Sequence, residues 1–342
     1  MACVSIALAL LSGVIGAGFA SGREILHFFG MRSGASAASI ACALMMLVYL
    51  FSRLPAQMER FGCASLSGLC RARFGPRMAR LTCALFALLA AATAGAMLSA
   101  CAELGALLLN VRHAYGLSLC ASLLLGMALS ARGMQGAAAA GAALTALVPA
   151  LLVRLLLLPA GEACFLPAMT PDLPVRAAAL GAAYGALNAA MIAGSLPLLL
   201  PLDGRMRRRA LLLFAALFGA MLALASCVIR RHLPAVCHQP LPFVYLSRNL
   251  GPGGYLLVAM SMYAAALSTL VCMLIALAPL LPVRPGAGRM PAAALALAFA
   301  LFGFESLVAR VYPLLGALCA GLLLVLCAGP SPAAQNRSPS SR

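Results

Sequence analysis

The sequence predicts an all-α, polytopic membrane protein of about ten transmembrane helices, and two observations support this. Only 9% of its 342 residues are charged and 64% are hydrophobic, whereas a soluble domain of this length carries about 25% charged residues. The apolar residues also come in blocks of about 20, the length at which a helix crosses a ~30 Å hydrocarbon core. We therefore exclude a soluble globular protein.

Clusters of Gly, Pro and Arg divide the chain into its candidate spans. Their expected limits are 4–29, 34–52, 79–109, 117–131, 137–158, 175–200, 209–230, 253–280, 291–309 and 311–328. Residues 1–328 thus form a single transmembrane domain. The tail 329–342 is polar and rich in Pro and Ser, so we expect it to be disordered.

The positive charge of the chain indicates orientation in a membrane. All 24 basic residues are Arg, and most lie in short links between apolar blocks. This distribution is typical of membrane topology and not of a nucleic-acid-binding surface. Links 2–3, 4–5, 6–7 and 8–9 with the tail hold fifteen Arg, against eight near the span ends of the opposite side. The richer side is expected to face the cytoplasm, which places both termini on the cytoplasmic side of the inner membrane.

The cysteines and the acidic residues do not indicate a metal site or an enzyme active site. The thirteen Cys residues are scattered without a C-x-x-C pair, and most lie in apolar stretches. They are interpreted as small packing residues, so we expect no metal site and no cofactor. No intramembrane acid–base or metal constellation is present in the sequence, so we do not expect an enzyme.

The spans divide into two halves, about 4–158 and 175–328, with five spans each. Halves with an odd number of spans insert with opposite topology. Inverted repeats of this kind are a common transporter architecture, and their binding sites lie where helices in corresponding positions are broken. The first and sixth spans are therefore the expected site.

The first span is crowded with glycine at Gly13, Gly16, Gly18 and Gly22. Each glycine costs about 1 kcal/mol in a helix interior, so the cluster favours unwinding. Unwound backbone is tolerated in a membrane only where it lines a cavity or binds a solute. The alternative is a small-residue face for close helix packing.

The sixth span has Tyr184, Gly185 and Asn188 near mid-membrane, with Gly194 and Pro197 further along. It corresponds in position to the first span and is also interrupted. Asn188 either binds a solute or hydrogen-bonds to a neighbouring helix, and the spacing leaves both open.

Charged and hydroxyl side chains inside the spans are further candidates. Arg23, Glu24 and Glu103 fall in the outer parts of spans one and three, where they form either an outer gate over the solute or an ion pair that satisfies these groups. In span eight, Ser268 and Thr269 either bond back to their own helix turn or supply two oxygen ligands for an alkali ion.

The run GVIGAGFASGREILHFFG at 13–30 closely resembles the opening helix of the YkvI-like membrane protein family. These bacterial proteins are distantly related to the amino acid–polyamine–organocation superfamily. The similarity extends to MLSACAELG, YGALNAA, ALSTL and YPLLGAL. It implies the five-plus-five inverted repeat of the sodium-coupled leucine transporter, with helices 1 and 6 broken.

The resemblance also implies roles for individual residues. The solute would lie against Gly16, Ala17, Gly18, Phe19, Tyr184, Gly185 and Asn188. A sodium ion, as the candidate coupling ion, would lie among Ser12, Ile15, Ala265, Ser268 and Thr269. Arg23 falls close to the position of an outer-gate Arg.

Two functions follow from these expectations. The first is a secondary active transporter of a small solute, an amino acid or related amine, by alternating access. The alternative is a solute sensor on the same fold, which resembles a membrane subunit of spore germinant receptors and binds without net uptake. The expected partners are the solute and the lipid bilayer, and the oligomeric state is left open.

Overall fold

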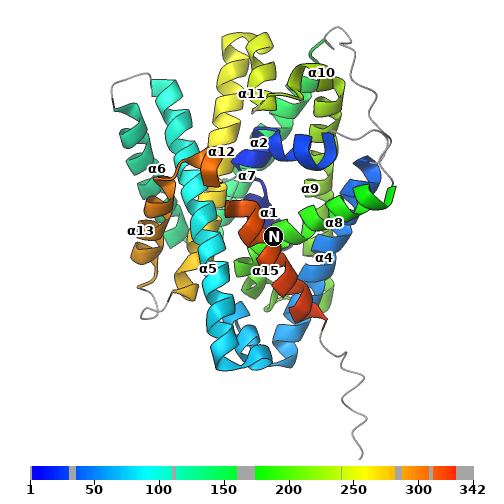
Figure 1. Cartoon of the computed structure of the whole chain (residues 1–342), viewed down its shortest axis with the longest axis vertical. Helices are drawn as coiled ribbons and strands as arrows, with labels where there is room; N and C mark the ends of the chain where they lie inside the picture. The colour runs from blue at the N-terminus through cyan, green and yellow to red at the C-terminus, as the bar shows by residue number, and fades with distance from the viewer. Residues whose placement is uncertain are drawn as a thin grey trace, which may run out of the picture.

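The computed structural model describes residues 2–30, 36–109, 113–159, 174–239, 241–281, 287–307 and 311–328. Within these ranges all regular secondary structure is helical (Figure 1). The tail 329–342 lies outside the described residues, and its expected disorder stays a prediction.

The helices follow the predicted spans in order. The first half contains α1 (Ala2–Val14), α2 (Ala17–Ala20), α3 (Arg23–Ile25), the π-helical η1 (Leu26–Gly30), α4 (Ser36–Arg60), α5 (Leu66–Leu109), α6 (Ala114–Ala131) and α7 (Met134–Leu156). The second half contains α8 (Pro174–Met191), the 3-10 helix η2 (Ile192–Leu199), α9 (Gly204–Arg231), α10 (Leu233–Val236), α11 (Pro242–Ser247), η3 (Arg248–Leu250), α12 (Gly251–Leu277), η4 (Ala278–Leu280), α13 (Arg289–Ala300), α14 (Phe304–Ser306) and α15 (Tyr312–Cys327).

The length and composition of the helices make the chain a multi-pass membrane protein. Among the described residues, seven helices are long and apolar enough to cross a membrane. Three shorter apolar helices, Cys3–Val14, Arg289–Ala300 and Leu314–Cys327, fall in the remaining predicted spans. The all-α, polytopic class is thus confirmed, while the count of ten crossings stays a prediction.

Span three differs from its predicted limits. Its helix α5 begins at Leu66, well before residue 79, because the link between spans two and three is itself helical. The chain bends sharply within this extension at Gly75, whose φ of 77° is readily adopted only by glycine. Pro76 follows and cannot donate a backbone hydrogen bond, which also favours the bend. The helical segment before the bend was not predicted, because the spans were placed by hydropathy and this segment is rich in Arg.

The packing of the bundle positions the site. In Figure 1, α6 and α13 lie on one side, α4, α8 and α9 lie on the other, and α5 and α12 run between them. Helix α12 packs against α5, α7, α6 and α1, and it also contacts the short helix α2. The most extensive helix contact joins α4 to α8. The gap between α1 and α2 therefore lies against the central helix α12.

Candidate functional site

The first span is broken at Ile15 and Gly16. Helix α1 ends at Val14, and Gly16 has an extended backbone (φ −96°, ψ −174°) before α2 begins at Ala17. A second interruption follows at Gly22, whose φ is 82°. The prediction of a broken first helix is therefore confirmed.

Two hydroxyl groups of α12 donate hydrogen bonds to the carbonyl oxygens at this break. The Thr269 hydroxyl is 3.2 Å from both the Ser12 and the Ile15 carbonyl oxygens. The Ser268 hydroxyl is 3.2 Å from the Ser12 carbonyl and 2.9 Å from that of Ala265. The structure thus brings together all five residues expected around sodium. Each hydroxyl has one hydrogen to donate, so the cluster also has oxygen lone pairs that are available to a cation.

A small cavity lies next to the break. It is lined by Val14, Gly16, Glu24, Ala92, Thr93, Ala96, Met97, Met191 and Leu307. The volume of the cavity is about 10 Å³, which is room for about one water molecule. The Ala17 N–H group donates to Met97 Sδ at 3.4 Å. Any molecule larger than water would therefore have to displace the methionine side chains, which are unbranched and flexible.

Glu24 faces this cavity. The turn at Gly22 folds α3 back, so a Cβ atom added to Gly18 would collide with the Glu24 carboxylate. The Tyr184 hydroxyl donates to Glu24 Oε2 at 3.4 Å. Glu103, in contrast, is exposed on α5 and accepts a hydrogen bond from Ser99 on its own helix. Glu24 therefore lies at the break, and the outer-gate role expected of Arg23, Glu24 and Glu103 stays a prediction.

Phe19 points into an aromatic cluster. Its buried ring lies 6.1 Å from Phe218 of α9, and Phe218 stacks on Tyr184 at 6.4 Å. Phe28 and Phe29 pack on the same tyrosine ring at 4.9 and 5.1 Å. The side chain of Phe19 thus packs on Phe218, which stacks on the Tyr184 ring, and Phe19 is not among the residues that line the cavity.

The sixth span is helical through Met191, and its irregularity is the 3-10 helix η2 that follows. Gly185 faces α4, because a Cβ atom there would meet the Ala43 carbonyl oxygen. Asn188 is fully buried and donates to the Tyr184 carbonyl at 2.9 Å. Its Oδ1 atom has no hydrogen-bond partner among the described residues. Of the three residues expected to face the solute, Tyr184 alone approaches the cavity, through Glu24.

Two residues of the site, Met97 and Met191, were not predicted from the sequence. Both line the cavity, and Met97 contacts the break directly through the Ala17 N–H group. Met191 follows Asn188 by three residues, so it lies on the same side of the helix one turn later. Asn188 does not itself line the cavity, so this spacing alone would not have identified Met191.

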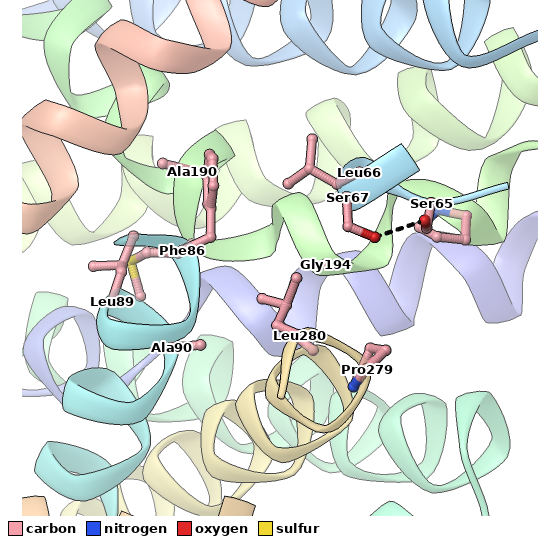
Figure 2. Close-up of a pocket in the computed structure, with 13 residues that line it drawn as sticks. Ser65, Leu66, Ser67, Phe86, Leu89, Ala90, Ala190, Gly194, Pro279 and Leu280 are labelled. Atoms are coloured by element: carbon pink, nitrogen blue, oxygen red, sulfur yellow. Dashed lines mark hydrogen bonds between the residues drawn. The ribbon is translucent and has the colours of Figure 1, made fainter. Parts of the chain in front are cut away.

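A second cavity of about 50 Å³ lies beyond Met191 (Figure 2). It lies between the first residues of α5, the 3-10 helix η2 and the end of α12 with η4. These elements lead into links 2–3, 6–7 and 8–9, which are the Arg-rich links. The paired hydroxyls of Ser65 and Ser67, 2.9 Å apart, lie at its rim. Met191 lines both cavities and so separates them.

Comparison with solved structures shows the fold class. No protein-family model matches the chain, and no curated protein matches its sequence. Solved structures that match include membrane transporters of the leucine-transporter fold, and this chain has that fold. The relation to the YkvI-like family stays a prediction.

Two of these structures are similar over nearly the whole chain. A mutant of the Eremococcus coleocola manganese transporter matches with a TM-score of 0.59 and 13% identity, over 96% of this chain and 76% of that one. Mhp1, a nucleobase-cation-symport-1 family transporter in a closed conformation with bromovinylhydantoin bound, matches with a TM-score of 0.56 and 16% identity, over 95% and 74%. At such identities the likeness shows the fold alone.

Proposed function

We propose that the protein is a secondary active transporter in the cytoplasmic membrane, with both termini inside. It moves a small solute, an amino acid or related amine, by alternating access, and it belongs to the YkvI-like family. The observation that supports this most strongly is the break at Gly16. It lies beside a cavity that Met191 separates from a second cavity at the Arg-rich end of the bundle.

The break provides a binding site near the middle of the membrane. Backbone groups without helical partners are tolerated there only inside protein or along a water-filled cavity. Transporters with inverted repeats bind their solutes at such breaks. In this proposal the solute binds beside Gly16, Ala17 and Gly18 and leaves through the second cavity when Met191 changes rotamer.

The oxygen cluster around Ser12 is the proposed sodium site. Carbonyl groups of an unwound helix coordinate sodium in transporters of this architecture. An ion that binds between Ser12, Ile15 and Ala265 turns the Ser268 and Thr269 hydroxyls so that their lone pairs face it. Sodium thereby replaces the hydrogen bonds from these hydroxyls, which couples ion binding to the position of α1 against α12.

Uptake into proteoliposomes tests the proposal. Labelled amino acids and amines are offered to the purified protein with an inward sodium gradient and with choline in its place. We expect saturable uptake of at least one solute, which is faster in sodium. Binding without uptake would contradict transport and favour the sensor function.

A matched pair of variants tests the route. Met191→Trp places an indole between the two cavities and is expected to block uptake while the folded protein is retained. Met45→Trp places the same side chain at an exposed position on α4, where Met45 is 62% exposed, and is expected to leave uptake unchanged. Equal uptake by both variants would show that solute does not pass Met191.

A further inference from the structure

Glu24 gives the break cavity its charge. Among the described residues that line the cavity, Glu24 carries the one formal charge, and the rest are Gly, Ala, Val, Leu, Met and Thr. Among the described residues, the neutral Tyr184 hydroxyl donates a hydrogen bond to the Glu24 carboxylate. A carboxylate within a membrane-spanning segment is costly and is normally paired. The Tyr184 hydroxyl positions the carboxyl group but brings no positive charge to it.

The end of α1 adds negative potential at the same place. Val14, the last residue of this 13-residue helix, lines the cavity. The C-terminal end of a helix carries a partial negative charge from its carbonyl groups. The Thr93 hydroxyl donates to the Leu89 carbonyl of its own helix at 2.8 Å and so does not offset this charge. The carboxylate and the helix end together favour a cation.

We propose that the solute is a net cation, a protonated amine without a carboxylate, whose ammonium group pairs with the Glu24 carboxylate. This inference rests on the proposed function and narrows its solute class. A net cation neutralises the cavity, whereas a zwitterionic amino acid leaves one negative charge there. The carboxylate of the amino acid would also find no cationic side chain among the described residues that line the cavity.

The remaining lining fits a short hydrocarbon body. Ala92, Ala96, Leu307 and the two methionines present apolar surface around the carboxylate. The thioether side chains of Met97 and Met191 adapt to an alkyl group at low cost because they are flexible and polarizable. The alkyl end of the amine therefore lies against Met97 and Met191, and its ammonium group points toward Gly18 and Glu24.

Binding to the purified full-length protein tests this assignment. The probes are two matched sets of amine, amino acid and acid: ethylamine, alanine and propionate, and isopentylamine, leucine and 4-methylpentanoate. Affinities are measured by calorimetry at neutral pH, in sodium and in choline. We expect each amine to bind about tenfold or more tightly than its amino acid, and the acids not to bind, because only the amines neutralise Glu24.

Two variants isolate the carboxylate. Glu24→Gln keeps an oxygen that accepts from Tyr184, so the fold is retained, and amine affinity is expected to fall about tenfold or more because the ammonium group loses its counter-ion. Glu59→Gln removes a carboxylate that pairs with Arg207 at an exposed position, and amine affinity is expected to stay the same. Circular dichroism and thermal unfolding confirm that both variants are folded.

Several outcomes would overturn the inference. These are failure of every amine to bind, equal binding of amines and amino acids, or unchanged amine affinity in Glu24→Gln. Uptake of a solute without an amine would leave the transport proposal standing while this inference fails. Amine binding without uptake would leave this inference standing while the transport proposal fails.

Discussion

The first and sixth spans are both rich in glycine, yet the fold uses glycine differently in each. In the first span, Gly16 is extended and Gly22 has a φ of 82°, so the helix breaks. In the sixth, Gly181 and Gly185 stay helical and lie against the Ser39 and Ala43 carbonyl oxygens of α4. Glycine permits either outcome, since it tolerates unusual backbone angles and also allows helices to approach closely.

The neighbouring helix decides between the two outcomes. At the first span, α12 presents the Ser268 and Thr269 hydroxyls to the carbonyl groups that the break releases. At the sixth span, α4 presents backbone, and the Ser39 hydroxyl donates across the contact to the Ala177 carbonyl at 2.6 Å. A broken helix needs hydrogen-bond partners for the carbonyl groups that it frees, whereas close packing of two helices needs small side chains at the contact. The first span therefore has the break, whereas α8 packs closely on α4 and stays helical.

The largest expected effect concerns the contact between α4 and α8. Replacing both Gly181 and Gly185 with Ala should destabilise the protein by about 1–3 kcal/mol per site, since each new methyl group would press on the backbone of α4. Thermal unfolding in detergent, followed by circular dichroism, measures the change. Gly116→Ala is the control, because a Cβ atom there meets nothing within 4 Å. Equal stability of the three proteins would contradict close packing of α4 and α8.

The next effect concerns the hydroxyls that hold the break. Ser268→Ala with Thr269→Val removes the donors to the Ser12 and Ile15 carbonyls, which should cost about 1–3 kcal/mol for each carbonyl left unsatisfied. Stabilisation by sodium should disappear with it. The control is Ser261→Ala on the same helix, whose hydroxyl lies 2.7 Å from the Leu257 carbonyl of its own turn and 3.3 Å from the Leu147 carbonyl of α7, so the variant keeps the donors at the break. A sodium response that persists in the double variant would remove the ion assignment.

A smaller effect on stability, but a large one on binding, is expected at Gly18. In Gly18→Leu the new side chain meets the flexible Glu24 side chain and no backbone atom within the nearest contacts. The carboxylate should swing aside, so the protein inserts and folds while solute binding is lost. Thermal stability with and without solute measures this, because a ligand that binds the native state raises stability in proportion to RT ln(1 + [L]/Kd). Retained binding would show that solute does not reach Gly18.

The smallest effect is expected at Asn188. Asn188→Leu removes one hydrogen bond within its own helix and also removes a buried oxygen without a described partner. These contributions oppose each other, so stability should change by about 1 kcal/mol or less. Solute affinity should also stay the same, as measured by calorimetry. A loss of affinity with intact stability would make Asn188 a solute ligand and extend the site to the sixth span.

The sequence by itself determined the class of the protein and where its elements lie. Apolar blocks of fixed length predicted the spans because the thickness of the bilayer, a property outside the chain, sets that length. The break near Gly16 was also predictable, since the cost of glycine in a helix is local. The hydroxyl pair at Ser268 and Thr269 was recognised as a candidate, although its partners lie more than 250 residues away.

Only the tertiary structure decided which way the side chains of the site face. Glu24 turns inward because Gly22 reverses the chain, and Gly185 faces α4 because that helix packs on α8. Met97 and Met191 come from helices far apart in sequence and meet at one cavity. The side of a helix that a residue occupies can be read from local spacing, but the neighbour on that side is set by packing between distant segments.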